Sequence, residues 1–256
     1  MIKIKTPEEI EKMRVAGQVV ARTLEALTSS IVPGKTRTID LDRMAEELLK
    51  EQGAKPSFKG YMDYPASTCI SINEVVVHGI PDERVIQAGD IVGIDLGAIV
   101  DGYHGDSAVT VPVGETTDEV RRLLRVARES LFKGIAQARA GNYIRDISRA
   151  IQEYVERHGY SVVREMVGHG IGTKMHEEPQ VPNYVTSRRG DMLQPGMTLA
   201  IEPMVNIGTF EIVHLPDKWT VVTKDRSLSA HFEHTVAITD NEPDILTLRR
   251  EEGARQ

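Results

Sequence analysis

Cysteine is nearly absent from this chain: Cys69 is the only one among 256 residues, so no disulfide can form within the chain. A single thiol cannot supply the ligands of a thiolate-rich structural zinc site, and sparse cysteine fits a reducing compartment. Long apolar runs are also missing. None approaches the length of about 18 residues that spans a bilayer, and the opening residues MIKIKTPEE lack the apolar stretch of a signal peptide. We therefore expect a soluble, cytoplasmic protein with no membrane association.

The chain also lacks an excess of positive charge. Lys and Arg number 31 against 38 Asp and Glu, which leaves a formal net charge of −7 at pH 7. Because nucleic-acid binding depends on neutralising phosphates, this balance argues against nucleic-acid specificity. Hydrophobic residues make up 40% of the chain and charged residues 27%, ordinary globular proportions that exclude extensive disorder. No Pro/Gly/Ser-rich linker divides the chain, so we expect residues 1–256 to form a single domain.

Capping signals and an apolar period of 3.6 residues predict helices at four places. Thr6-Pro7-Glu8-Glu9 is a capping box with proline at the first helical position, and it opens a helix that runs toward Pro33-Gly34. Further helices are expected over about residues 40–53, from the capping box Thr116–Glu119 to about residue 141, and over about residues 144–158.

Outside these helices the apolar period changes to two, which predicts strands. They are expected at residues 68–73, 91–96, 97–111, 199–205, 219–223 and 232–238. Helices in pairs and strands in hairpins indicate an α+β fold with a mainly antiparallel sheet. Each half also contains a His-Gly-Ile element followed by a strand that carries a carboxylate, which leaves an internal duplication open.

Two aspartates indicate a functional site in the first half. Asp95 lies in an apolar strand, where a buried carboxylate must be paired, hydrogen-bonded or bound to metal; a structural aspartate that holds a turn is the alternative. Asp101-Gly102 predicts a two-residue hairpin turn. In that register Asp95 and Asp106 are diagonal neighbours on one face, with Cβ atoms within about 8 Å. Like charges this close require cations or a shared proton.

Glu202 and Glu233 repeat this pattern in the second half, each inside an apolar strand. Singly, either could face solvent from a half-exposed strand, but strand carboxylates that arrive two per half favour a shared site. His78, His169 and His176 lie on turns rather than in helices, where they could add imidazole ligands. The remaining histidines are expected to be structural: His104, His158, His214, His231 and His234.

The candidate ligands indicate which metals the site would take. An oxygen-rich set with one or two imidazoles suits manganese, iron(II), cobalt(II) or catalytic zinc. The carboxylates carry a total charge that two divalent ions balance. Paired ions about 3.5–4 Å apart that hold a hydroxide between them serve hydrolases. These residues therefore favour a dinuclear metal-dependent hydrolase.

The candidate residues and their surroundings resemble the signature of the type I methionine aminopeptidases. The matching strings are SINEVVVHGIP at 71–81, DGYHGD at 101–106, GHGIG at 168–172, HEEP at 176–179, IEPM at 201–204 and SLSAHFEHT at 227–235. The resemblance covers essentially the whole chain. It implies a pita-bread fold, in which pseudo-twofold duplicated α/β halves surround a mainly antiparallel, curved sheet.

The resemblance also implies an activity and a set of metal ligands. The enzyme would remove the N-terminal methionine from nascent proteins and peptides with a small second residue. A hydroxide that bridges two metal ions would attack the first peptide bond. Asp106 and Glu233 would bridge the two metals, Asp95 would complete one metal site, and His169 with Glu202 would complete the other.

Further roles follow from the same resemblance. Glu202 would take and pass on the proton of the attacking water, His176 would stabilise the carbonyl oxygen as it becomes anionic, and His78 would contact the scissile amide nitrogen. The methionine pocket would be apolar and sulfur-tolerant, although ordinary core packing is the alternative for its aromatic members. Family members often carry cysteine at the position of Phe58. The expected pocket residues are Phe58, Tyr61, Tyr64, Cys69, Met175 and Trp219.

The metals and partners are expected as follows. Iron(II), manganese, cobalt and zinc all suit the divalent sites, and backbone groups near Asn73, Val75 and Ser229 would hold one monovalent cation, as in some relatives. The partners would be the N-termini of nascent polypeptides, and the chain is expected to be a monomer. A transient association with ribosomes stays open. We expect no N-terminal zinc-finger extension of the kind that some relatives use.

Three rival interpretations fit the sequence less well. A prolidase or Xaa-Pro aminopeptidase typically carries a substantial N-terminal domain, for which the stretch before His78 is too short. A type II methionine aminopeptidase would carry a helical insertion in the second half, and only Pro179 to Gly196 separates the relevant motifs. A metal-free binding protein on the same fold would have lost metal ligands, whereas all five are present.

Overall fold

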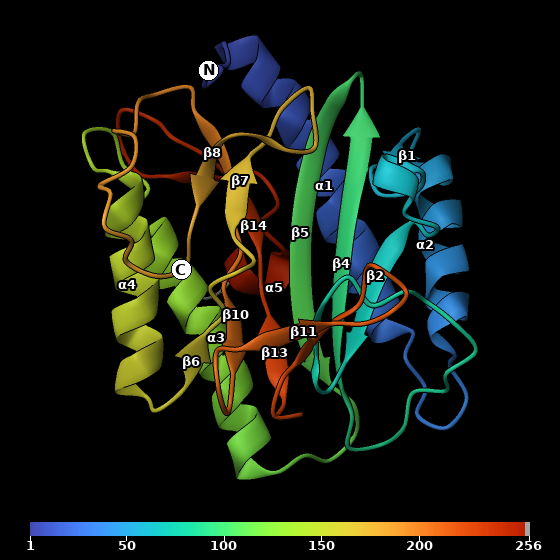
Figure 1. Cartoon of the computed structure of the whole chain (residues 1–256). Helices are drawn as coiled ribbons and strands as arrows, with labels where there is room; N and C mark the ends of the chain where they lie inside the picture. The colour runs from blue at the N-terminus through green and yellow to red at the C-terminus, as the bar shows by residue number, and fades with distance from the viewer. Residues whose placement is uncertain (254–256) are drawn as a thin grey trace.

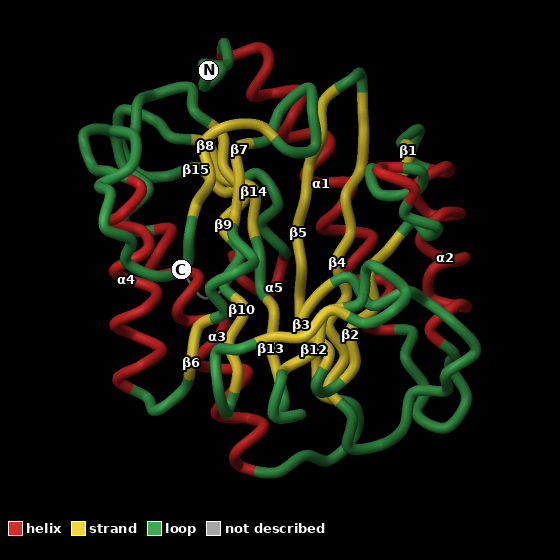
Figure 2. Tube along the Cα trace, in the orientation of Figure 1, coloured by secondary structure: helices red, strands yellow, loops and turns green. Residues whose placement is uncertain are grey.

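Antiparallel strands form one layer of the molecule, and long helices lie behind this layer and on either side of it (Figure 1). The computed structural model describes residues 1–253. The helices are α1 (Pro7–Ser29), α2 (Thr38–Glu51), α3 (Asp118–Ile135), α4 (Ile144–Arg157), the short α5 (Arg250–Gly253) and the 3-10 helix η1 (Tyr61–Asp63). Figure 2 shows the same arrangement, with strands along the centre and helices outside.

The strands form several small sheets that follow one another around a curved layer. One sheet contains β1 (Lys55–Pro56), β2 (Thr68–Ile72), β4 (Ile91–Val100) and β5 (Tyr103–Pro112). A second contains β6 (Ser161–Val162), β10 (Met204–Asn206) and β13 (Ser229–His231), and a third contains β3 (Val75–Val77), β11 (Ile212–His214) and β12 (Val221–Thr223). The last contains β7 (Gly168–Gly170), β8 (Glu177–Val181), β9 (Thr198–Ile201), β14 (His234–Ala237) and β15 (Asp244–Ile245).

The two halves of the chain follow the same plan. In the first half, α1 packs on α2 and on the hairpin β4–β5; in the second, α3 packs on α4 and on β9 and β10. The apolar core lies between these helices and the strands. It includes Leu24, Leu41, Ile94, Leu123, Ile147 and Leu199, all 1% exposed or less. The predicted α+β fold, with duplicated halves around a mainly antiparallel sheet, is confirmed.

Local capping chemistry explains where the helices begin. The Thr6 hydroxyl accepts a hydrogen bond from the Glu9 amide at 3.2 Å, and the Glu9 carboxylate accepts one from the Thr6 amide at 2.8 Å, as the capping box predicts. The third helix starts one residue later than predicted, because the hydroxyl of Thr117, not Thr116, reaches the Val120 amide. It also ends earlier, at Ile135.

The hairpin β4–β5 has the register that Asp101-Gly102 predicts. Asp95 pairs with Ala108 and Gly97 pairs with Asp106, so the two aspartates are diagonal neighbours on one face. Residues 91–100, predicted as parts of two strands, form one continuous strand, β4.

The strand predicted at residues 199–205 is interrupted at its carboxylate, Glu202, and the strand predicted at 232–238 begins only at His234, after its carboxylate, Glu233. β9 and β10 flank Glu202-Pro203, while β13 and β14 flank Phe232-Glu233. The proline at 203 has no amide hydrogen for the ladder. The amide of Glu233 leaves the ladder as well, and donates to the Ala108 carbonyl of β5 at 3.0 Å. Each break therefore lies at a candidate ligand, and the second one ties β14 to the first half.

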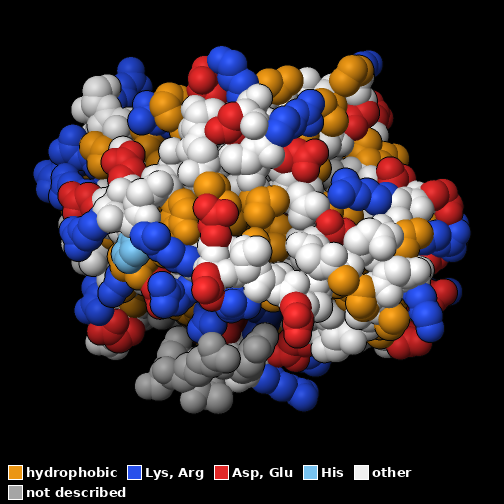
Figure 3. Space-filling view, turned by 90° about the horizontal axis from the view of Figure 1, so that it is seen from below, with side chains coloured by type: hydrophobic (Ala, Val, Ile, Leu, Met, Phe, Trp, Pro, Cys, Tyr) orange, Lys and Arg blue, Asp and Glu red, His pale blue; other side chains and the backbone are white. Residues whose placement is uncertain are grey.

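Seen from below, side chains of both charge signs are interspersed, and hydrophobic side chains are exposed in small patches (Figure 3). None of the helices in residues 1–253 combines the length and the apolarity that crossing a lipid bilayer requires.

A close backbone contact holds α1 against β5, and it can be tested through Gly105. A Cβ added to Gly105 would lie 2.6 Å from the Gly17 amide nitrogen of α1. We expect Gly105→Ala to lower the free energy of unfolding by about 1–3 kcal/mol, because rigid backbone cannot make room. Gly93→Ala in β4 is the matched control, since its added Cβ would meet its nearest atoms at 3.4 Å. Equal stability of the two variants in urea denaturation would contradict the argument.

Candidate active site

A cavity of about 210 Å³ opens where the two halves meet. Every residue that the sequence predicted as a metal ligand, catalytic group or methionine-pocket residue lines it, and Met62 of η1 is an additional member that was not predicted. The lining residues are Phe58, Tyr61, Met62, Tyr64, Cys69, His78, Asp95, Asp106, His169, Met175, His176, Glu202, Trp219 and Glu233. The fold thus brings together side chains that are far apart in the sequence.

Carboxylates from both halves form the acidic end of the cavity. Asp106 is 3% exposed and Glu233 is 2% exposed, and Asp95 and Glu202 are partly buried beside them. Burial raises the pKa of Asp95 to about 7 and that of Glu202 to about 8. The pKa values of Asp106 and Glu233 are raised well above the ordinary carboxyl range by burial and by the neighbouring carboxylates. These groups therefore repel one another when ionised.

No Lys or Arg among residues 1–253 lines the cavity to balance this charge. In the described part of the chain, Asp95 Oδ1, Asp106 Oδ1 and Glu233 Oε1 are buried and accept no hydrogen bond. Buried polar atoms are normally partnered. Unpartnered carboxylate oxygens that converge on one point fit a site for divalent cations, whose preferred ligands are oxygens of this kind.

His169 adds an imidazole to these oxygens. Its Nδ1 lies 2.9 Å from the Gly170 carbonyl oxygen, which can only accept, so Nδ1 carries the proton. Burial lowers the pKa of His169 to about 3, so the ring is neutral and Nε2 has a free lone pair. That nitrogen lies 3.6 Å from Glu202 Oε1 and 3.9 Å from Asp106 Oδ2. A lone pair directed at carboxylate oxygens requires either a proton on a carboxyl or a cation between them, and ligand atoms of Asp106, His169 and Glu233 all lie within 4.8 Å of one another.

His176 and His78 line the same cavity. The rings of His169 and His176 are 4.2 Å apart between centroids, and His176 Nδ1 lies 2.8 Å from the Tyr61 hydroxyl. His78 has a left-handed backbone with φ of 58°, and its ring meets the indole of Trp219 edge to face at 6.2 Å. Burial lowers the pKa of His78 to about 4, so this ring is also neutral near pH 7.

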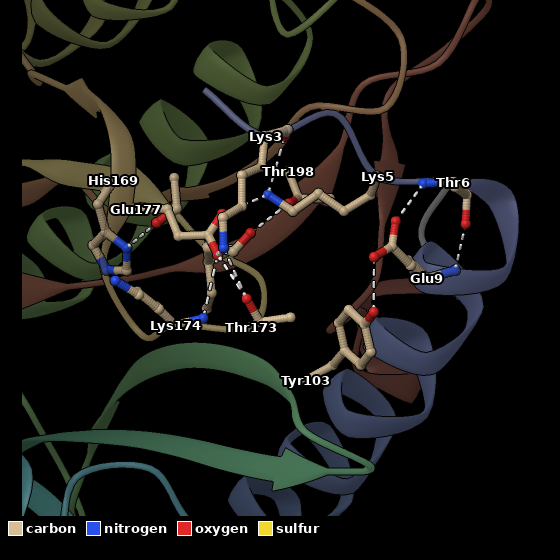
Figure 4. Close-up of polar contacts among 12 residues, drawn as sticks. Lys3, Lys5, Thr6, Glu9, Tyr103, His169, Thr173, Lys174, Glu177 and Thr198 are labelled. Carbon is tan, nitrogen blue, oxygen red and sulfur yellow. Dashed lines mark hydrogen bonds and ion pairs between the residues drawn. The ribbon is translucent and has the colours of Figure 1, made fainter. Parts of the chain in front are cut away.

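The N-terminal segment supports the loop that carries His176, a contact the sequence did not predict. Lys5 Nζ lies 2.8 Å from Glu177 Oε2, and both side chains are nearly inaccessible. The other carboxylate oxygen of Glu177 accepts from the Lys174 amide at 3.2 Å. Figure 4 shows this network beside His169. Because 172 residues separate the two partners, no local sequence signal could have indicated the pair.

Apolar side chains form the other end of the cavity. Phe58, Tyr64, Cys69 and Met175 belong to a buried cluster separate from the main core, with Tyr61 and Trp219 packed against it. The Tyr64 ring meets the Trp219 ring edge to face at 5.0 Å. The Tyr64 hydroxyl donates to the carbonyl oxygens of Thr68 and Gly79, so no polar hydrogen is left toward the cavity.

The residues expected near a monovalent cation lie close together in the second and third sheets and the turn between β2 and β3. The Ser229 amide donates to the Asn73 carbonyl oxygen at 2.9 Å, and Asn73 has a left-handed φ of 58°. Val75 lies at the start of β3 and pairs with Val222.

Histidines expected to be structural largely have structural contacts. His104 bonds to Ser57, His158 to the Tyr154 carbonyl oxygen, and His234 to Thr247 and Glu252. His231 differs from this expectation, because its Nε2 lies 3.6 Å from Glu202 Oε2 at the edge of the acidic group. One signal was present in the sequence: His231 lies two residues before Glu233, and alternate residues of a strand share a face.

Comparisons with known proteins agree with this geometry. The model of metallopeptidase family M24 matches residues 11–240. The chain is 55% identical over 249 residues to the methionine aminopeptidase of Clostridium acetobutylicum. This match covers 97% of this chain and 99% of that protein. The crystal structure of the methionine aminopeptidase from Thermotoga maritima superposes with a TM-score of 0.94 at 50% identity, covering 96% of this chain and 99% of that chain.

The prolidase from Pyrococcus furiosus shares the fold more distantly. Its TM-score is 0.80 at 27% identity, and the match covers 96% of this chain but only 66% of the prolidase. The resemblance to the type I methionine aminopeptidases is confirmed, and the chain belongs to metallopeptidase family M24 and, within it, to the methionine aminopeptidases.

Proposed function

We propose that this chain removes the N-terminal methionine from polypeptides whose second residue is small. The observation that carries the proposal is a single cavity with an acidic, imidazole-bearing end and a separate apolar, sulfur-containing end. A free N-terminal amine is a cation, which suits the carboxylates, and a methionine side chain suits the apolar wall, because thioethers pack well against sulfur and aromatic rings.

Membership of family M24 implies that the protein uses divalent metal, and the residues present fit two such ions. Asp106 and Glu233 would lie between the ions, with Asp95 at one side and His169 with Glu202 at the other. The neutral His169 and the unpartnered carboxylate oxygens support this assignment. When bound, divalent ions polarise the substrate carbonyl and lower the pKa of a water. Iron(II), manganese, cobalt and zinc all suit this ligand set.

The remaining polar side chains would act on the substrate. Glu202 would accept the proton of the attacking water and pass it to the leaving amine. The Tyr61 hydroxyl would donate to His176 Nδ1, so that Nε2–H is free to donate to the carbonyl oxygen as negative charge develops there. His78, neutral and edge to face with Trp219, would contact the amide nitrogen of the scissile bond.

The apolar cluster would hold the methionine side chain. Its wall would offer aromatic edges and sulfur atoms, from Tyr64, Cys69, Met175 and Trp219. The Tyr64 hydroxyl hydrogen is already bonded to carbonyl oxygens, so it would not face the methionine side chain. The Phe58 and Tyr64 rings meet edge to face, with their centroids 6.5 Å apart. Because phenylalanine is bulkier than the cysteine that family members often carry at this position, Phe58 would narrow the methionine pocket beside Tyr64.

The setting of the activity is part of the proposal. The natural substrates would be the N-termini of nascent polypeptides, in the cytoplasm, with the chain acting as a monomer. Transient association with ribosomes would place the enzyme near these substrates. Asn73, Val75 and Ser229, whose backbones already lie together, would hold one monovalent cation.

The activity itself is tested with short peptides. We expect the manganese-loaded protein to cleave Met-Ala-Ser and Met-Gly-Ser much faster than Met-Leu-Ser, because a cavity of about 210 Å³ leaves little room for large second side chains. Chelation should abolish the cleavage. An Xaa-Pro dipeptide is the control for prolidase activity. Equal rates on Met-Ala-Ser and Met-Leu-Ser, or preferred cleavage of the Xaa-Pro dipeptide, would contradict the proposal.

The role of His176 is tested by His176→Ala. Loss of one donor to a developing oxyanion costs about 2.7–4 kcal/mol, so kcat should fall roughly a hundred- to a thousandfold. Metal content should stay at the wild-type level, because His176 is not needed among the five ligands. Metal analysis of the purified variant is the check, and a metal-free variant would show that His176 is itself a ligand.

Charge in the acidic group also predicts how stability depends on pH and metal. A carboxyl whose pKa is raised on folding holds its proton to a higher pH in the folded protein than in the unfolded chain. The free energy of unfolding therefore falls as the pH rises from the unfolded-state pKa to the folded-state pKa. With ordinary values near 4 and folded values of about 7 for Asp95 and about 8 for Glu202, the chelated protein should lose stability from about pH 4 to about pH 8. Manganese should remove this dependence and add about 2.7 kcal/mol at a hundredfold excess over Kd.

Asp106→Asn is the informative variant for this prediction. It should reduce the gain from manganese more than Asp95→Asn does, because a bridging ligand serves both ions. Without metal it should be more stable than the wild type, since one repelling charge is gone. Thermal unfolding with chelator and with manganese measures both effects. A wild-type midpoint that does not respond to metal would exclude a dinuclear centre built on these carboxylates.

A further inference from the structure

His231 is a buried histidine that the proposed reaction does not use. It is the last residue of β13, and it is 5% exposed. Its Nε2 finds no hydrogen-bond partner among residues 1–253, although buried polar atoms of this kind are normally partnered. The nearest carboxylate oxygen is Glu202 Oε2, at 3.6 Å. The imidazole therefore points at a candidate metal ligand without yet forming a hydrogen bond to it.

The backbone holds this ring in place from two sides. The His231 amide donates to Thr110 Oγ1 at 3.0 Å, and the Thr110 hydroxyl donates to the His231 carbonyl oxygen at 2.8 Å. On the other side, β13 pairs with β10, with His231 opposite Met204. The backbone that carries the ring is therefore anchored to both β5 and β10.

The carboxylate of Glu202 lies between two imidazoles. Its Oε1 is 3.6 Å from His169 Nε2, and its Oε2 is 3.6 Å from His231 Nε2. Because His169 Nδ1 carries its proton toward Gly170, its Nε2 is a lone pair that can only face a cation or a donor. His231 has no such constraint. Its Nε2 can carry a proton and donate, and charge-assisted N–H···O bonds close to about 2.7–2.9 Å.

We propose that His231 is a positioning residue for Glu202: its Nε2–H donates to Oε2, which leaves Oε1 as the one oxygen that Glu202 offers to the metal it shares with His169. The inference rests on the proposed function of the site. Metal-ligating carboxylates are commonly held by such hydrogen bonds, and loss of the partner typically costs about 10–100-fold in metal affinity or activity. Here the bond would also fix which oxygen is free to handle the proton of the water.

Two substitutions of His231 distinguish the effect of its N–H donor from the effect of its bulk. His231→Gln retains an N–H donor, whereas His231→Leu retains bulk and removes the donor. We expect His231→Leu to bind manganese about 10–100-fold more weakly by calorimetry, and His231→Gln to remain within a few-fold of the wild type. His104→Leu is the matched control, because it removes a buried histidine that bonds to Ser57 and not to Glu202. It should lower the thermal midpoint without selective loss of metal affinity.

A spectroscopic measurement on the wild type tests the same bond even if His231→Leu does not fold. In zinc-loaded protein with 15N-labelled histidine, we expect His231 Nε2 to be protonated and slow to exchange. A deprotonated Nε2 with the shift of a metal ligand would overturn the proposal, as would a His231→Gln variant that binds manganese as weakly as His231→Leu. Wild-type affinity in His231→Leu would overturn it as well. These readouts do not depend on peptide cleavage, so failure of the proposed function is recognised separately, by the Met-Ala-Ser assay.

Discussion

Repulsion among carboxylates in one largely buried cavity is the constraint around which this structure is arranged. Burial raises the pKa values of Asp95, Asp106, Glu202 and Glu233, and neighbouring carboxylates add to the rise at Asp95, Asp106 and Glu233. No lysine or arginine among residues 1–253 lines the cavity to offset this charge. Such an arrangement is unfavourable unless protons or cations are bound. The neutral His169, whose lone pair faces two of these carboxylates, favours cations. The rest of the fold supplies the rigidity that keeps like charges together.

That rigidity comes from the contact between the two halves. The Ser107 and Thr110 hydroxyls of β5 donate to the carbonyl oxygens of Glu233 and His231, and the Thr235 hydroxyl donates to the Asp106 carbonyl oxygen. Side-chain hydroxyls, rather than a continuous backbone ladder, thus join β5 to β13 and β14. Each half brings two of the carboxylates, so the geometry of the candidate metal centre depends on this contact and not on either half alone.

The substrate side of the cavity is formed by loops that contacts with residues distant in the sequence hold in place. The loop that carries His176 is fixed by the buried pair of Lys5 and Glu177, and the apolar cluster around Tyr64 is separate from the main core. Loops that carry functional side chains need such supports, because a loop by itself does not hold a side chain at a defined position. A rigid acidic end and a supported apolar end together favour cleavage beside a methionine side chain.

The sequence by itself determined the features that local chemistry controls. The capping box at Thr6 and the turn at Asp101-Gly102 each depend on neighbouring residues, and the turn placed Asp95 and Asp106 on one face of a hairpin. The strings around the candidate ligands were enough to identify the family. Only the tertiary structure decided the strand breaks at Glu202-Pro203 and Phe232-Glu233, the pairing of Lys5 with Glu177 and the approach of His231 to Glu202. These features join segments that are distant in the chain, or depend on which sheet a strand enters. Packing of the whole molecule, and not the preference of any short stretch, selects among such arrangements.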